Sequence, residues 1–354
     1  MKRIPLNDLF EKGKQFLEEL KPSDKIALIY HMDMDGICSA ALMHKAFIKI
    51  MNEGKTKVKI SKSVASTYND IKKIFRELDD FNKIMIVDIG IDRIDDSRKI
   101  LLIDHHLIKR DLNSDSVIYI NPRFEDTHIY QPASYVVYKF LSTITDMKEF
   151  EWIAVLGIVC DFGYEDCVDV LKNWVAVKDK SDLFNTEFGT FGNLLLGASY
   201  VLGFDKVLDF LVKSNSLEEL KDIKELSDAY KIYESAFNES KKEFWKNAES
   251  FGNVIFSIIK PKYRRLSSPI INRISFENQD KMIFLLEKID GKYKISARYQ
   301  NAEKVGINLG ELMRKCCNGG GHVAAAGGSI KIEDFEKFKE CVLKELSSLS
   351  KHGA

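Results

Sequence analysis

The stretch IALIYHMDMDG at residues 26–36 decides the fold, because an apolar run ends abruptly in a histidine and two aspartates. Three later apolar runs end in the same way: IMIV before Asp88, ILLI before DHH at residues 104–106, and IVC before Asp161. Short apolar runs separated by longer amphipathic segments predict a mostly parallel sheet flanked by helices. The carboxyl ends of the strands share one edge of such a sheet, where ligands bind. We therefore expect an α/β protein with its chemistry at that edge.

The first part of the chain carries most of this alternation. Strands are predicted at residues 26–30, 58–61, 84–87, 99–103 and 117–120, and helices at 36–51, 135–141 and 152–159. The helical spacing of the last segment leaves open whether Asp161 follows a strand or a helix. Residues 217–249 contain no Gly or Pro and have apolar residues at three- or four-residue spacing, which indicates a long helix or a helix pair.

The C-terminal part has a different pattern. Strands are predicted at residues 254–259, 282–287 and 293–298, followed by an amphipathic helix at 334–349. The dipeptide Asp290-Gly291 lies between the last two strands and is a strong hairpin signal. We therefore expect a catalytic domain at residues 1–204, a helical linker at 205–250 and a smaller α/β domain at 251–354.

Composition excludes several classes of protein. The 354 residues are 45% hydrophobic and 30% charged with a formal net charge of zero, as in an ordinary soluble protein. No apolar stretch approaches the roughly 20 residues that span a bilayer, and the N-terminus has no signal-peptide core. We expect a cytoplasmic protein with no membrane partner. Residues 260–315 contain 13 basic and 6 acidic residues, so the second domain is locally positive.

The six cysteines show no C-x-x-C spacing and no pattern of a disulfide framework. The adjacent pair Cys316-Cys317 is poorly placed to bond to itself. Most of the others lie in apolar or helical segments. We therefore expect buried free thiols in a reducing compartment.

The acidic and histidine residues together predict a metal site. His31, Asp33 and Asp35 would face one side of an extended segment, with Gly36 allowing a tight turn into the helix. The alternative is a helix cap for this segment, and Asp88 or Asp161 alone would also be read as caps. Two adjacent histidines after a buried strand cannot both point inward. Imidazoles with several carboxylates and no thiolates favour two Mn²⁺, with Mg²⁺ or Co²⁺ as substitutes, over structural zinc.

A second signal is GGGHVAAAGG at residues 319–328. Glycines let backbone N–H groups approach an anion, and His322 adds a donor. No Gly-Lys-Ser/Thr follows, so this is not a Walker loop, and the alanines indicate the start of a tightly packed helix. A tight turn that packs a helix on the sheet is the alternative. Arg298, at the end of a predicted strand in the basic domain, is a further candidate for phosphate contact.

In their order and spacing, these motifs resemble a known family. The H-x-D-x-D-G, D, D-H-H and D series resembles the DHH phosphoesterase superfamily, and G-G-G-H-x-x-A-A-G resembles the DHH-associated C-terminal domain. That superfamily includes RecJ-type single-strand exonucleases, short-oligonucleotide phosphodiesterases of the nanoRNase and pAp phosphatase type, and cyclic-dinucleotide phosphodiesterases. The compact length is most similar to that of archaeal RecJ-like proteins. Val323 departs from the family, where many members have Pro.

The resemblance implies a role for each motif residue. One Mn²⁺ would be held by His31, Asp33 and Asp88, and the second by Asp35, Asp88, His105 and Asp161, with Asp88 bridging. His106 would face the scissile phosphate, with Asp104 supporting the site from behind. Substrate phosphate or base would be bound by Gly319, Gly320, Gly321, His322 and Arg298. Asn121-Pro122 matches the family's Asn-Pro, with a less defined role.

Three functions follow as expectations. The first is a metal-dependent phosphodiesterase that trims single-stranded DNA, RNA or short oligonucleotides to 5′-nucleotides by attack of a bridging hydroxide. The second is a cyclic-dinucleotide or pAp phosphodiesterase with the same metal core. The third is an inactive scaffold for replication or repair, which retention of every ligand position disfavours. The sequence leaves open the cleavage polarity, a homodimer, and DNA- or RNA-processing partners.

Overall fold

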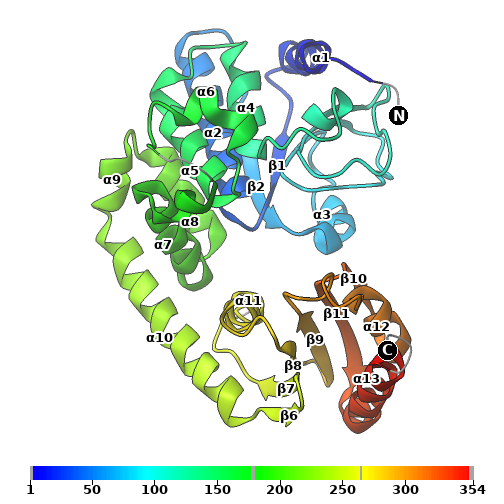
Figure 1. Cartoon of the computed structure of the whole chain (residues 1–354). Coiled ribbons are helices and arrows are strands. Elements are labelled where there is room, and N and C mark those ends of the chain that lie inside the picture. The colour runs from blue at the N-terminus through cyan, green and yellow to red at the C-terminus, as the bar shows by residue number, and fades with distance from the viewer. Residues whose placement is uncertain (1–2, 177–179, 264, 351–354) are drawn as a thin grey trace. The chain divides into compact units, whose positions relative to one another are not determined.

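The computed structural model describes residues 3–176, 180–263 and 265–350 and divides into two compact units, residues 1–230 and 231–354 (Figure 1). The division falls inside helix α10 (Lys224–Lys246), which follows the short helix α9 (Leu217–Lys221). The segment 217–249 is thus a helix pair rather than one helix. Within the described residues, every helix is too short or too polar to cross a bilayer.

The first unit is built on a five-stranded parallel sheet. Its order is β2 (Ile60–Ser66), β1 (Ile26–His31), β3 (Lys83–Val87), β4 (Lys99–Ile103) and β5 (Val117–Ile120). The three central strands are almost completely buried, because helices cover both faces of such a sheet. The predicted α/β class is confirmed. The strand predicted at 58–61 begins later and runs to residue 66.

The helices of the first unit pack mostly on α2 (Met34–Asn52), whose nearly continuous apolar surface lies at the centre of the core. Its neighbours are α4 (Ala133–Ser142), α5 (Glu151–Cys160), α7 (Glu187–Leu202) and α8 (Phe204–Lys213). Helix α1 (Leu6–Glu18) packs on β5. The shorter helices are α3 (Ile71–Glu77) and α6 (Val168–Leu171), with 3₁₀ turns at Tyr68–Asp70, Pro122–Phe124, Lys148–Phe150, Glu165–Cys167 and Lys180–Asn185.

The second unit is built on a six-stranded sheet of mixed direction. Its order is β10 (Asn318–Gly321), β11 (Ala325–Lys331), β9 (Lys292–Arg298), β8 (Met282–Ile289), β7 (Val254–Ile259) and β6 (Glu249–Phe251). Only β7 and β8 run parallel among the pairs of described strands. Two apolar clusters form around it, one with α12 (Leu309–Cys316) and α13 (Phe335–Ser350), the other with α10 and α11 (Ser267–Glu277). A last 3₁₀ turn is Ile332–Asp334.

The two turn predictions of this unit had opposite outcomes. Asp290 and Gly291 both have positive φ, 47° and 74°, as a two-residue hairpin between β8 and β9 requires, so that prediction is confirmed. The prediction that a helix starts at the alanines of 324–326 is wrong, because this segment enters strand β11. Gly319 to Gly321 pair in register with residues 326–328, and the small side chains permit this close hairpin.

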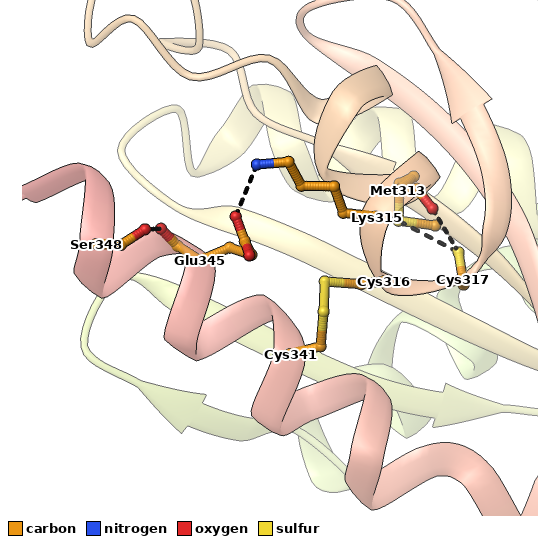
Figure 2. The surroundings of a disulfide bond; sticks show 7 residues. All are labelled: Met313, Lys315, Cys316, Cys317, Cys341, Glu345 and Ser348. Carbon is orange, nitrogen blue, oxygen red and sulfur yellow. Dashed lines mark hydrogen bonds and ion pairs between the residues drawn. A yellow bond between two sulfur atoms is a disulfide. The ribbon is translucent and has the colours of Figure 1, made fainter.

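A disulfide overturns the prediction of free thiols for two cysteines. Cys316, the last residue of α12, is bonded to Cys341 of α13 (Figure 2). The ion pair between Lys315 Nζ and Glu345 Oε2, at 2.9 Å, joins the same two helices. The pairing depends on tertiary packing across 25 residues, which spacing alone does not reveal. The remaining cysteines are free thiols, as expected: Cys38, Cys160, Cys167 and Cys317.

Candidate metal centre

Three neighbouring strands deliver most of the candidate site. Strands β1, β3 and β4 lie side by side and parallel, so His31, Asp88 and Asp104 reach the same edge of the sheet. Asp161 arrives differently, as the C-cap residue of helix α5. The structure thus decides the alternative left open by the sequence, because a helix and not a strand carries this carboxylate to the site.

The first group of candidate ligands is His31, Asp33 and Asp88. The Nδ1 atom of His31 lies 2.5 Å from Asp33 Oδ2 and 3.5 Å from Asp88 Oδ2. Asp33 is also the N-cap of α2, because its Oδ1 accepts a hydrogen bond of 2.9 Å from the N–H of Gly36. The helix therefore begins at Met34, earlier than predicted, and the capping alternative accounts for one oxygen of Asp33 while the other faces His31.

The early start of α2 corrects two expectations. Asp35 lies in the first turn of the helix and not on an extended segment with His31 and Asp33. Gly36 is not a turn residue either. A Cβ added there would lie 2.4 Å from the carbonyl oxygen of His31, so glycine permits a close approach between the helix and the end of β1.

The second group is Asp35, His105 and Asp161. His105 Nε2 lies 3.9 Å from Asp35 Oδ2 and 3.6 Å from Asp161 Oδ2. The buried carboxylate of Asp35 accepts hydrogen bonds of 2.6 and 2.9 Å from the backbone N–H groups of Ala133 and Ser134. These belong to the first turn of α4, where unsatisfied donors and the helix dipole favour a negative charge. The helix therefore fixes Asp35 against the centre.

Asp88 lies between the two groups. Its Oδ2 is 3.5 Å from His31 Nδ1, and its Oδ1 is 3.4 Å from His105 Nε2. Both oxygens are buried, and neither has a hydrogen-bond partner among the described residues. The residue also has a positive φ of 60°, a costly backbone conformation that aspartate tolerates better than most residues. A buried carboxylate needs positive charge beside it, which either the protonated imidazoles or bound cations would supply.

The electrostatics of the cluster favour bound cations. Burial, reinforced by Asp88 and Asp161, raises the pKa of Asp35 well above its usual value, and burial raises the pKa of Asp161 to about 6. Burial lowers the pKa of His31, but the carboxylates of Asp33 and Asp88 outweigh it and raise that pKa to about 11. The protein alone thus gathers mutually repelling carboxylates around imidazoles.

The residues fit divalent metal ions. In each group, one atom from each residue lies within 4.8 Å of the others, and Asp88, His105 and His106 form a further such group. The donors are imidazole nitrogens and carboxylate oxygens, a set that suits Mn²⁺ and related ions. The nearby Cys38 is buried and Cys160 is half-buried, and desolvation raises the pKa values of both thiols, so they stay protonated.

His106 and Asp104 form a second layer at the rim. The Nδ1–H of His106 donates to Asp104 Oδ1 at 2.7 Å, while 45% of the His106 side chain is exposed. Asp104 is fully buried, and its Oδ2 accepts a 3.1 Å hydrogen bond from the hydroxyl of Tyr119. Asn121 donates to both the Tyr119 hydroxyl and the His106 carbonyl at 3.0 Å. This network orients the His106 ring with its Nε2 free of the Asp104 contact.

Sequence reasoning missed three residues of the site: Tyr119, described above, Tyr130 and Arg123. The Tyr130 hydroxyl donates to Asp161 Oδ2 at 2.7 Å, and the Arg123 Nε–H donates to the His105 carbonyl at 2.8 Å. The Arg123 guanidinium also lies 5.9 Å from the centre of the Tyr130 ring. The only signal near them was the Asn-Pro at 121–122, because no local pattern reveals which tyrosine reaches a ligand 31 residues away.

The predicted substrate residues gather in the second unit. Arg298, at the end of β9, pairs with Ala325 of β11, and its Nε–H donates to Asn272 Oδ1 at 2.8 Å. A Cβ at Gly319 would lie 2.5 Å from the Gly327 carbonyl oxygen, and Gly321 has a φ of 147°, so close packing explains these two glycines. At Gly320 the nearest atom to such a Cβ is 3.8 Å away on Arg314. His322 is exposed beside this strand.

Comparison with known proteins places the chain in a family. Residues 25–160 match the model of the DHH family N-terminal domain, and residues 252–348 match that of the DHHA1 domain. A search of curated protein sequences finds no match.

Solved structures share the fold. RecJ from Thermus thermophilus in complex with Mn²⁺ has a TM-score of 0.72 at 14% identity over 98% of this chain and 55% of its own, so the chain spans about half of that protein. An exonuclease RecJ bound to manganese has a TM-score of 0.68 at 14% identity, covering 96% and 94%. A pGpG-specific phosphodiesterase from Vibrio cholerae has 0.53 at 14%, covering 92% and 99%. With two family models matching in order, the chain belongs to the DHH family, whose members are metal-dependent phosphoesterases.

Proposed function

We propose that the chain is a manganese-dependent phosphodiesterase that degrades single-stranded DNA, RNA or short oligonucleotides from an end and releases 5′-nucleotides. The observation that carries the proposal is Asp88, a buried carboxylate whose two oxygens each face a different imidazole and have no hydrogen bond among the described residues. That placement supports a bridging role between two cations. Similarity to RecJ structures that contain Mn²⁺ supports the choice of metal.

The residues that would hold the ions divide into the two groups described above. His31, Asp33 and Asp88 would hold one, and the second would be held by Asp35, Asp88, His105 and Asp161. Bound divalent ions would supply an activated water nucleophile and offset the charge that develops on the phosphate. The backbone N–H groups of Ala133 and Ser134 keep Asp35 in place.

His106 is the residue best placed to act on the phosphate directly. Its Nδ1–H is held by Asp104, so Nε2 is the atom left to face substrate at the exposed rim. Burial lowers the pKa of His106, but Asp104 outweighs burial and raises it above its usual value. A protonated ring would donate from Nε2 to a phosphate oxygen and stabilise the transition state.

Release of 5′-nucleotides sets which bond breaks. Water attacks phosphorus, the P–O3′ bond breaks, and the departing 3′-oxygen takes a proton. The phosphate stays on the 5′-oxygen of the nucleotide on the 3′ side of the cleaved bond. In the second unit, Arg298 and His322 with the glycines of 319–321 would bind a phosphate or base of the same strand. The excess of basic residues over 260–315 favours a strand over a small ligand.

A second candidate is a phosphodiesterase of small nucleotides such as linear or cyclic dinucleotides or pAp. The observation in its favour is the similarity to the pGpG-specific enzyme, which this chain matches over 99% of that enzyme's length. The catalytic residues would be the same in both functions. The difference would lie in how much of a strand the protein accepts beyond the cleaved bond.

One panel of substrates tests both proposals. The full chain is incubated with Mn²⁺ and with single-stranded DNA and RNA labelled at either end, a trinucleotide, pAp and cyclic di-AMP, and products are separated by size. Release of labelled mononucleotides from one end of the long strands supports the exonuclease. Turnover confined to the trinucleotide, pAp or cyclic di-AMP supports the small-nucleotide enzyme. Absence of Mn²⁺-dependent hydrolysis in the whole panel contradicts both.

A further inference from the structure

An exposed phenylalanine follows the Asp161 carboxylate directly. Phe162 has a φ of 56°, a left-handed conformation that is a genuine outlier for a bulky side chain. Its side chain does not compensate for this strain by packing in the core, because the residue is 41% exposed. Strained backbone and exposed apolar surface beside a candidate metal ligand both call for a functional explanation.

The end of helix α5 explains the backbone but not the side chain. The N–H of Gly163 donates to the Ile158 carbonyl at 2.9 Å, and that of Phe162 to the Val159 carbonyl at 3.3 Å. This is the paired hydrogen bonding of a Schellman motif, in which the left-handed position is usually glycine. Here the glycine is one residue later, where a Cβ would lie 2.5 Å from Pro132. The motif would be less strained with glycine at 162, so the geometry of the helix end does not explain the phenylalanine side chain.

A second aromatic ring stands against the first. Phe184, in the 3₁₀ turn Lys180–Asn185, packs edge-to-face on Phe162 with ring centres 4.1 Å apart, and it is 39% exposed. The two rings stabilise each other and keep an apolar surface at the solvent. The Nζ of Lys180 lies 5.9 Å from the centre of the Phe162 ring.

Besides the chain itself, Lys180 and Tyr130 connect the aromatic pair to the candidate metal centre. Lys180 Nζ also lies 5.0 Å from the centre of the Tyr130 ring, and the Tyr130 hydroxyl donates to Asp161 Oδ2 at 2.7 Å. Consecutive Cα atoms are about 3.8 Å apart, so the backbone of Phe162 directly adjoins that of Asp161. The aromatic pair and the Lys180 ammonium are therefore connected to the candidate metal centre both along the chain and through Tyr130.

We propose that Phe162, supported edge-on by Phe184, stacks on a nucleobase of the substrate, with Lys180 beside the adjoining phosphate. This rests on the proposed function and deepens it, because it assigns to this unit a preference for phosphodiesters that carry a base beside the cleaved bond. Stacking on aromatic rings accepts every base, since each has a π-face, so the contact selects nucleotides without reading sequence.

The test couples a change in the protein to a change in the substrate. The substrates are a short single-stranded oligonucleotide that wild type cleaves and a set in which one of the first three nucleotides is replaced by a tetrahydrofuran abasic unit. We expect Phe162→Leu to lower kcat/KM on the natural strand by about 5- to 150-fold, the range for loss of one base–aromatic stack. On the strand whose abasic unit replaces the stacked nucleotide, the kcat/KM values of wild type and Phe162→Leu should differ less than twofold.

Two controls separate stacking from structure. Phe162→Trp places an equally strained but larger aromatic ring at the site and should keep kcat/KM within about threefold of wild type. Phe251→Leu removes an aromatic residue of similar exposure in strand β6. This variant should have the same kcat/KM as wild type on every substrate. Mn²⁺ affinity measured by calorimetry should be the same in wild type and Phe162→Leu.

The outcomes are distinguishable. An equal loss on natural and abasic strands, or a matching loss of Mn²⁺ affinity, means that Phe162 acts only on the fold of the Asp161 loop and overturns the inference. Full activity of Phe162→Leu on every substrate also overturns it and points to docking of another protein. If wild type cleaves no nucleotide substrate at all, the proposed function itself fails, which the wild-type measurement reveals before any variant is compared.

Discussion

Replacing Asp88 with asparagine removes one charge from the middle of the candidate metal centre and changes little else. Asparagine has the same shape and tolerates the left-handed backbone that this position requires, with its φ of 60°. Alanine would combine loss of the carboxylate with added backbone strain. The asparagine variant should therefore fold normally, and its defect should report on charge.

The size of the defect follows from the distances. The Asp88 oxygens lie 3.4 and 3.5 Å from the facing imidazole nitrogens of His105 and His31. At such a separation a pair of unit charges interacts by about 5 kcal/mol with an effective dielectric constant of about 20. A cation held in the same place loses at least that much binding free energy when the carboxylate becomes an amide, and about 1.4 kcal/mol corresponds to a tenfold change in affinity. We expect the Mn²⁺ concentration that gives the half-maximal rate to rise by about three orders of magnitude or more.

The assay is steady-state cleavage of a substrate from the panel above, with Mn²⁺ raised until the rate no longer increases. Asp92→Asn is the matched control, because Asp92 lies four residues further on, bonds to the Tyr68 hydroxyl at 2.8 Å and belongs to none of the ligand groups. Circular dichroism checks that both variants are folded. A rise of less than tenfold in the Mn²⁺ concentration that gives the half-maximal rate of Asp88→Asn would refute the role assigned to this carboxylate.

Three further predictions concern protons and stability. Burial lowers the pKa of His44 to about 4, so between pH 6.5 and 4 only the unfolded chain takes up this proton. The free energy of unfolding in urea should therefore fall by about 2 kcal/mol between pH 6.5 and 5, and a similar fall in His44→Gln would exclude His44 as the cause. Reducing the disulfide between Cys316 and Cys341, which closes a loop of 25 residues, should lower the stability of the second unit by about 3 kcal/mol in a thermal unfolding experiment, and an unchanged melting temperature would contradict this. Neighbouring carboxylates raise the pKa values of His31 and His105 to about 11 and 10 against the effect of burial, so both rings are protonated at pH 7.5 in the metal-free protein. Mn²⁺ binding should therefore release protons and become tighter as the pH rises. Identical heats of Mn²⁺ binding in buffers of different ionisation enthalpy would rule this out.

Much of the metal centre could be predicted because the physics that places it is local. A buried parallel strand reads as a continuous apolar run, and the residue after it must emerge at the sheet edge, as His31, Asp88 and Asp104 do. The bounds of β4 and β5 were predicted to the residue for the same reason. What periodicity could not decide was the start of α2, because Asp33 and Asp35 suit an extended segment and a helix cap equally well.

The parts that the sequence did not reveal depend on contacts between distant residues. Tyr130 becomes part of the site only because its loop crosses the end of α5, where its hydroxyl meets Asp161. The disulfide likewise depends on the packing of α12 on α13. The helix prediction for the glycine-rich segment was wrong for a different reason. Its small residues suit a close-packed helix and a close-packed hairpin, and pairing with β9 at Arg298 selects the hairpin.

The central claim is that the ligand groups around Asp88 hold two divalent ions. Crystals of the full chain grown with Mn²⁺ and measured at the manganese absorption edge test it most directly. Two anomalous peaks are expected, one bounded by His31 and Asp33 and the other by Asp35, His105 and Asp161, with Asp88 in contact with both. A single peak that leaves one group empty, or peaks only elsewhere in the chain, would rule out a two-ion centre around Asp88.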